Sequence, residues 1–170
     1  MESTLSGPIG PLVLLVEDNA RNARLVEQIL RANGYQVAWV TDGWAALEAA
    51  HSMQPQLILM DLQLPGMDGL TITRKLKEDA STAAVPVIAV TAHAMREHRT
   101  QLLAAGCCSY ISKPISYRPF LDEIKRVLDR QGDAVRRHES HRPAPWYPRL
   151  EQAVVALREA ETEEVVNASH

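Results

Sequence analysis

The feature that most constrains the fold is a short apolar run that ends in a carboxylate. Residues 57–60 read Leu-Ile-Leu-Met, Asp61 follows them, and a loop containing Pro and Gly occupies residues 62–69. A continuous apolar run of this length, bounded by turn residues, is typical of a strand buried on both faces of a parallel sheet. Asp61 would then lie at the carboxyl end of the strand, where ligands bind in open α/β sheets. Taken alone, an aspartate here is more often a turn residue than a nucleophile.

Four other segments are predicted to be strands, and a predicted helix follows each of the five. The predicted strands are residues 12–16, 35–40, 56–61, 87–90 and 108–111. The predicted helices run from a cap at Asn19 to Asn33-Gly34, from Trp44 to Met53, from Leu70 to about Asp79, from Ala94 to Ala105, and from Tyr117 to Arg130, with Gly132 ending the last. This alternation predicts a parallel sheet with helices on both faces. Right-handed crossovers would gather the carboxyl ends of the strands at one edge.

The composition excludes several classes of protein. With 170 residues, the chain holds one domain of ordinary size and some excess. Its net charge of −3 gives no general attraction for nucleic acid or an anionic membrane. No apolar run approaches the ~20 residues of a membrane span, and residues 1–10, expected to be a flexible leader, do not read as a signal peptide. The adjacent Cys107 and Cys108 lack zinc-ligand spacing, so we expect a protein of the reducing cytoplasm.

Ionic or hydroxyl side chains follow four of the five predicted strands. Glu17 and Asp18 come after the first, Asp61 after the third, Thr91 after the fourth and Lys113 after the fifth. Three converging carboxylates repel one another, and a divalent cation relieves that repulsion. An oxygen-only site with room for water suits Mg²⁺ better than Zn²⁺ or a calcium cage. A carboxylate nucleophile, a metal and donors for anionic oxygens are the parts that phosphoryl transfer requires.

The motifs around these residues resemble the receiver domain of two-component response regulators. They are Leu-Leu-Val-Glu-Asp-Asn at 14–19, Leu-Met-Asp-Leu-Gln-Leu-Pro-Gly-Met-Asp-Gly at 59–69, Val-Thr-Ala at 90–92 and Tyr-Ile-Ser-Lys-Pro at 110–114. The resemblance covers residues 11–131 and is nearest to stand-alone regulators of cell-cycle phosphorelays and to receivers attached to hybrid kinases. It implies a flavodoxin-like, doubly wound sheet of five parallel strands in the order 2-1-3-4-5.

The resemblance also implies a phosphorylation and metal site. Asp61 would accept a phosphoryl group from a histidine kinase or a histidine phosphotransfer protein. Asp18 would bind Mg²⁺ directly, Glu17 would bind it through water, and Asp61 and the backbone carbonyl of Gln63 would be further ligands. The chain departs from the commoner family pattern at Glu17, where an aspartate is more usual.

Three further residues gain expected roles from the same resemblance. Thr91 and Lys113 would contact the phosphoryl oxygens, and Tyr110 occupies the position of an aromatic switch that works with Thr91. The Lys113–Pro114 peptide bond is often cis in the family. The implied function is a protein interaction surface that phosphorylation switches for a downstream protein partner. Enzyme activity would be limited to self-phosphorylation from phosphodonors and slow autodephosphorylation.

Two other functions are compatible with a fold of this class. A flavin-binding electron carrier would bind phosphate in the loop after the first strand, but Glu17 and Asp18 would repel it there. An aspartyl-phosphate hydrolase of the haloacid dehalogenase type would have an acid two residues after the nucleophile, where this chain has Gln63. Absence of colour in the purified protein would exclude the flavin carrier. Failure to turn over small phosphate esters would exclude the hydrolase.

The residues after the globular part differ in character. Residues 132–149 are rich in Pro and Arg and are predicted to be a linker, because prolines prevent a helix. Residues 150–166 place apolar side chains at helical spacing and predict an amphipathic helix for homodimerisation or for docking on a partner, with disorder or folding back as the alternative. Residues 167–170 are predicted to be a disordered end. A winged-helix output domain does not fit in this tail, so we expect no direct DNA binding.

Overall fold

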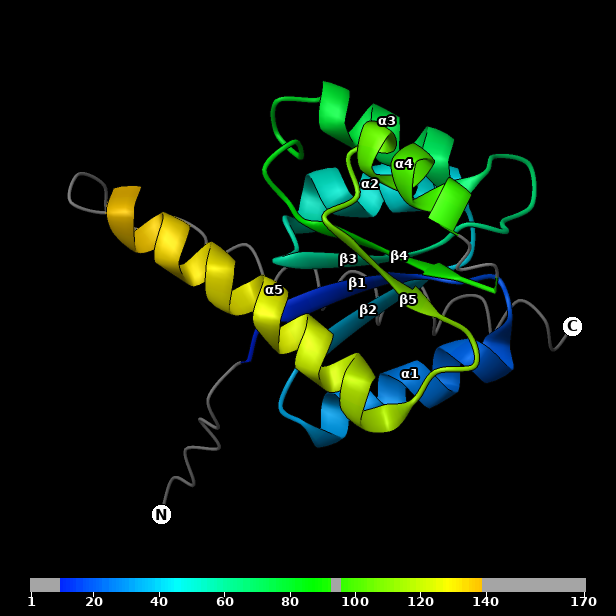
Figure 1. Cartoon of the computed structure of the whole chain (residues 1–170), viewed down its shortest axis with the longest axis horizontal. Coiled ribbons are helices and arrows are strands. Elements are labelled where there is room, and N and C mark those ends of the chain that lie inside the picture. Colours follow the sequence, from blue (N-terminus) through cyan, green and yellow to red (C-terminus); the bar gives the residue numbers. More distant parts are fainter. Residues whose placement is uncertain (1–9, 93–95, 139–170) are drawn as a thin grey trace, which may run out of the picture. The chain divides into compact units, whose positions relative to one another are not determined.

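The computed structural model describes residues 10–92 and 96–138, which contain one parallel sheet and five helices (Figure 1). The strands are β1 Leu12–Val16, β2 Gln36–Val40, β3 Leu57–Asp61, β4 Val87–Thr91 and β5 Ser109–Ser112. The helices are α1 Ala20–Ala32, α2 Gly43–Met53, α3 Gly69–Glu78, α4 Arg96–Ala105 and α5 Tyr117–His138. The strand order β2-β1-β3-β4-β5 confirms the predicted doubly wound fold.

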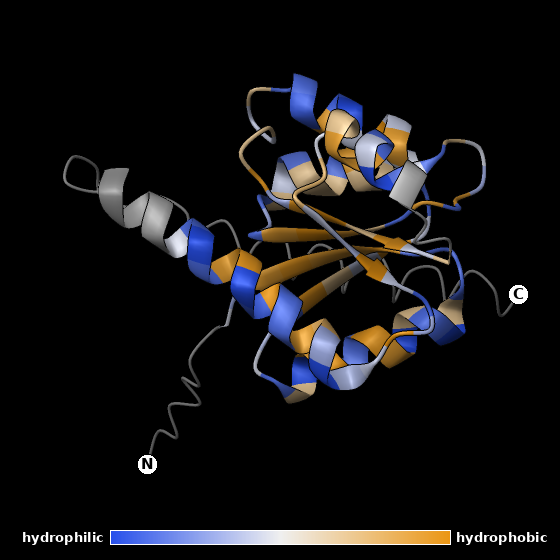
Figure 2. Cartoon of the chain, viewed as in Figure 1, coloured by the Kyte–Doolittle hydropathy of each residue, from blue (hydrophilic) through white to orange (hydrophobic). Residues whose placement is uncertain are grey.

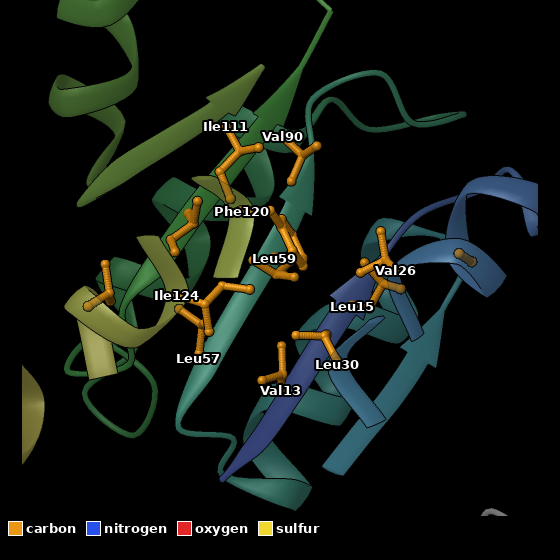
Figure 3. Packing of buried hydrophobic residues seen from close by; sticks show 13 residues of the cluster. Val13, Leu15, Val26, Leu30, Leu57, Leu59, Val90, Ile111, Phe120 and Ile124 are labelled. Atoms are coloured by element: carbon orange, nitrogen blue, oxygen red, sulfur yellow. The ribbon is translucent and has the colours of Figure 1, made fainter. Parts of the chain in front are cut away.

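Helices cover both faces of the sheet. Figure 1 shows α1 and α5 on one face and α2, α3 and α4 on the other. In the layer beneath α1 and α5, Leu30 and Phe120 from the helices pack with Val13, Leu57 and Leu59 from the strands (Figure 3). All five side chains are fully buried. Burial of each one stabilises the fold by about 1.5–3 kcal/mol relative to exposure, so this layer holds the site-bearing strands in place.

The three inner strands are buried along their whole length. Every residue of β1, β3 and β4 is buried, whereas most of β2 is only partly covered. Helices above and below the sheet explain why these strands are continuous apolar runs instead of alternating ones (Figure 2). The register pairs Val16 with Met60, Asp61 with Val90, and Thr91 with Ser112. The carboxyl ends of four strands therefore lie at one edge of the sheet.

Side-chain caps begin three helices at this same edge. Asn19 accepts hydrogen bonds from the first backbone N–H groups of α1, Asp42 does so for α2, and Asp68 does so for α3. Each cap has an extended backbone, as an N-cap residue requires, and contributes about 1 kcal/mol to helix stability. From each of these caps a helix leads the chain back over the sheet.

The predicted end of the last helix at Gly132 is wrong, because α5 continues to His138. A glycine ends a helix when it adopts a positive φ just beyond the last turn. Gly106 does so after α4, with φ of +102°, whereas Gly132 is not among the residues with positive φ. The first residues of the predicted linker are therefore helical. The rest of that linker, the predicted helix at 150–166 and residues 1–9 lie outside the described residues, as does the predicted start of α4 at Ala94.

None of the described helices is both long enough and apolar enough to cross a membrane.

Candidate functional site

Three carboxylates meet where β1 and β3 end. Glu17 directly follows β1 and Asp61 is the last residue of β3, and both are almost completely buried. Asp18 is exposed beside them. One oxygen of each lies within 4.8 Å of one oxygen of each of the others. We call these three residues the acid cluster, and their convergence follows from the parallel register of the two strands.

Lys113 links the two buried members of the acid cluster. It follows β5, and its backbone N–H donates to the Thr91 carbonyl at 2.8 Å, which continues the β4–β5 pairing. Its Nζ lies 2.9 Å from Asp61 Oδ2 and 3.0 Å from Glu17 Oε2. The Lys113–Pro114 peptide bond is cis. One ammonium group therefore bridges two carboxylates that would otherwise repel each other.

The remaining oxygens of these two carboxylates are also hydrogen-bonded. Asp61 Oδ1 accepts from the Gln63 backbone N–H at 2.9 Å. Glu17 Oε1 accepts from the Asn19 backbone N–H at 3.0 Å and from Asn22 Nδ2 at 3.4 Å. Both side chains are thus fixed in orientation before any ligand arrives. The Gln63 contact also brings the loop after β3 close to the Asp61 carboxylate.

Burial and charge shift the pKa values of the bridged groups. Burial raises the pKa of Glu17, while hydrogen bonds from Lys113 and Asn19 act against it and the charge of Asp61 adds to the rise. Burial alone would lower the pKa of Lys113, but its hydrogen bonds and charge contacts with Asp61 and Glu17 outweigh burial and raise it. The Lys113 ammonium therefore stays protonated at neutral pH.

The loop after β3 packs tightly against the strand end. Gly69 begins α3, and a Cβ atom placed on it would lie 2.3 Å from the Asp61 carbonyl oxygen. The Gly69 N–H donates to the Leu62 carbonyl at 3.2 Å. Only glycine permits this approach, which returns the chain beside Asp61. Sequence analysis predicted this helix only from Leu70 and did not predict the close approach, because the sequence does not reveal which backbone lies next to Gly69.

The other predicted site residues occupy two different places. Thr91 is buried at the end of β4, on the strand that pairs with β3. Tyr110 is 38% exposed on β5, opposite Ala89 and not at the strand end. It lines a cavity of about 610 Å³ together with Phe120, Glu123 and others. Tyr110 therefore belongs to the surface made by β5 and α5.

The acid cluster can hold a metal ion. All of its side-chain donors are carboxylate oxygens, which hard cations prefer. The Asp18 side chain makes no hydrogen bond within the described part of the chain, so its oxygens are available to a ligand. Sequence reasoning missed two residues that contact Glu17, namely Asn22 and Trp39. The Trp39 contact depends on how β2 pairs with β1, and the sequence gives no signal for that register.

Comparison with known proteins identifies the family. Residues 13–125 match the family model of the response regulator receiver domain. The chain belongs to the response regulator receiver family. This assignment favours a receiver over the flavin carrier and the phosphate-ester hydrolase. The receiver motifs at 14–19, 59–69, 90–92 and 110–114 all lie within the matched range.

Individual relatives resemble this receiver closely. The polar-differentiation response regulator DivK of Brucella anthropi is 44% identical over 122 residues, covering 72% of this chain and 97% of that relative. The receiver domain of a sensor histidine kinase from Pseudomonas aeruginosa is 38% identical with a TM-score of 0.63, covering 72% of this chain and 97% of that one. Its crystal structure has a magnesium ion coordinated in the active-site cleft. A CheY-like receiver of Methanospirillum hungatei is 30% identical with a TM-score of 0.69, covering 74% of this chain and 98% of that one.

Proposed function

We propose that this receiver accepts a phosphoryl group on Asp61 from the phosphohistidine of a histidine kinase or of a phosphotransfer protein. The observation that carries the proposal is the Asp61 carboxylate itself. It lies in the acid cluster and contacts the Lys113 ammonium at 2.9 Å. A carboxylate nucleophile with a cation beside it matches the requirements of phosphoryl transfer.

The transfer exchanges one bond for another at phosphorus. An oxygen of Asp61 attacks the phosphorus atom, the phosphorus–nitrogen bond to the donor imidazole breaks, and the imidazole takes up a proton from water. Lys113, already in contact with Asp61, shifts its ammonium toward the negative charge of the incoming group. The Thr91 hydroxyl donates a hydrogen bond to a phosphoryl oxygen.

Mg²⁺ would complete the charge balance of this site. Asp18 would bind it directly, Glu17 would reach it through water, and Asp61 and the Gln63 carbonyl would be its other protein ligands. When bound, the ion neutralises the charge that gathers on the phosphoryl oxygens. The fit rests on the oxygen-only donor set and on the exposed carboxylate of Asp18 within it.

The output is a change of surface at β5 and α5. A phosphoryl group adds charge and acceptor oxygens, which draw Thr91 and Lys113 toward Asp61. Movement of Thr91 frees space for the Tyr110 ring, which is 38% exposed in this structure. A downstream protein partner would read the altered surface around the cavity that Tyr110 lines.

One experiment tests both the acceptor and the switch. The chain is incubated with acetyl phosphate, with and without Mg²⁺, and the adduct is mapped by mass spectrometry. We expect one phosphoryl group on Asp61 that requires Mg²⁺ and is absent in Asp61→Asn. Amide resonances of β5 and α5 should shift in the same sample, while those of β2 and the C-terminal half of α2 stay in place. Labelling that persists in Asp61→Asn refutes the acceptor, and unchanged β5 resonances refute the switch.

A further inference from the structure

Trp39 on the edge strand is hydrogen-bonded to the backbone of the acid cluster. Its indole Nε1–H donates to the Glu17 carbonyl oxygen at 2.7 Å. The Glu17 backbone N–H also bonds to β2, donating to the Val40 carbonyl at 3.1 Å. β2 therefore holds Glu17 through both of its backbone polar groups, and only the bond from Trp39 uses a side chain.

The carbonyl that Trp39 holds belongs to the peptide group joining Glu17 to Asp18. The next peptide group is fixed as well, because the Asn19 N–H donates to Glu17 Oε1 at 3.0 Å. Asp18 thus lies between two anchored peptide groups. Its own side chain is exposed and has no hydrogen bond within residues 10–92 and 96–138. The direction in which Asp18 leaves the backbone is consequently set by its neighbours.

We infer that Trp39 is a positioning residue of the acid cluster: its indole N–H fixes the Glu17–Asp18 peptide group so that Asp18 is presented to Mg²⁺. This inference rests on the proposed function, in which Asp18 is a direct ligand. Groups that orient metal ligands by hydrogen bonds contribute to metal affinity without touching the ion. Trp39 meets this description, since it contacts the ligand-bearing backbone and no carboxylate oxygen of the cluster.

The exposure of Trp39 distinguishes this role from simple packing. The residue is 37% exposed, so the ring is not enclosed in the core, while its N–H reaches a backbone carbonyl. The net free-energy contribution of one hydrogen bond of this kind corresponds to about a fivefold change in an equilibrium constant at 25 °C. We therefore expect loss of the N–H to weaken Mg²⁺ binding about fivefold in the folded protein.

The test compares three variants of the full chain by calorimetric titration with Mg²⁺. Trp39→Phe keeps an aromatic ring and removes the donor. Trp39→Gln places an amide donor the same number of bonds from Cα. Trp44→Phe alters another exposed tryptophan, whose indole makes no hydrogen bond within the described residues. We expect weakened Mg²⁺ binding in Trp39→Phe, substantial recovery in Trp39→Gln, and wild-type affinity in Trp44→Phe. During titration of the wild type with Mg²⁺, the indole N–H resonance of Trp39 should shift, and the midpoint of this shift should equal the midpoint of the calorimetric titration.

The outcomes separate this inference from the proposed function. Wild-type Mg²⁺ affinity in Trp39→Phe overturns the inference while Asp61 phosphorylation still stands. Equal weakening in Trp39→Phe and Trp39→Gln also overturns it, because ring packing and not the donor would then control affinity. A wild-type chain that neither binds Mg²⁺ nor forms the Asp61 adduct refutes the proposed function and the inference together. Thermal unfolding of each variant without Mg²⁺ measures any loss of fold stability separately.

Discussion

At the scale of single residues, Lys113 controls the electrostatics of the site. Its ammonium bridges Glu17 and Asp61, whose side chains are 4% and 6% exposed. Lys113→Met would leave both carboxylates buried and close together without a cation, which we expect to lower the free energy of unfolding by about 3 kcal/mol in EDTA. Saturating Mg²⁺ should reduce this loss, because an ion that binds only the folded state stabilises it. Urea unfolding with and without Mg²⁺ measures both effects, and Lys125→Met, an exposed change on α5, is the control. Equal losses in the two variants would contradict the bridging role.

At the scale of elements, the cap of α3 connects the loop after β3 to acid stability. Asp68 accepts hydrogen bonds from the Leu70 and Thr71 backbone N–H groups at 3.0 Å and from the Thr71 hydroxyl at 2.6 Å. The hydroxyl bond is the main reason that its pKa lies below its ordinary value, with burial opposing it and the backbone N–H groups adding to the effect. A carboxyl whose pKa is lowered on folding stabilises the fold above its unfolded pKa, and this stability is lost as pH falls through the folded pKa.

The lowered pKa of Asp68 predicts the behaviour of two cap variants. Asp68→Ala should cost about 1 kcal/mol at pH 7, whereas Asp68→Asn should keep most of the cap. Because an amide does not titrate, Asp68→Asn should lose less stability than wild type as the pH falls below about 4, the ordinary range of an aspartate. Urea unfolding at a series of pH values measures this, with Asp122→Asn on the exposed side of α5 as the control. Parallel acid profiles for wild type and Asp68→Asn would show that the cap carboxylate does not titrate as described.

The elements also show which parts of this fold the sequence specifies locally. β1, β3 and β4 were predictable because a strand covered on both faces is apolar without interruption, and the polar residue that ends each run marks the site edge. The end of α5 was not predictable, since Gly132 stops a helix only if its φ turns positive, and the presence of a glycine does not by itself determine that φ. The Trp39–Glu17 bond was missed for a similar reason. It joins two strands whose register follows from the whole sheet, and an exposed tryptophan on an edge strand has no pattern that names its partner.

At the scale of the whole molecule, the receiver match covers residues 13–125 of the 170-residue chain, and the sequence beyond His138 carries the last prediction. Residues 150–166 lie outside the described residues, and their sequence places Leu150, Val154 and Leu157 at helical spacing. A lone helix of this length is marginal in water, so its apolar stripe requires a partner surface. Trp146 and Tyr147 precede it, and aromatic residues of this kind often anchor protein interfaces.

We therefore predict that the full chain self-associates through this segment. Light scattering at tens of micromolar should give twice the mass of one chain for the full sequence and a single-chain mass for a protein truncated after His138. Leu157→Glu should abolish association because it places a charge in the apolar stripe, whereas Gln152→Glu, outside the stripe, should leave it intact. Single-chain masses for every protein, with and without acetyl phosphate, would exclude homodimerisation. The remaining role for residues 150–166 would then be docking on another protein. In that case, truncation after His138 should weaken binding to the purified phosphodonor or to the purified downstream partner.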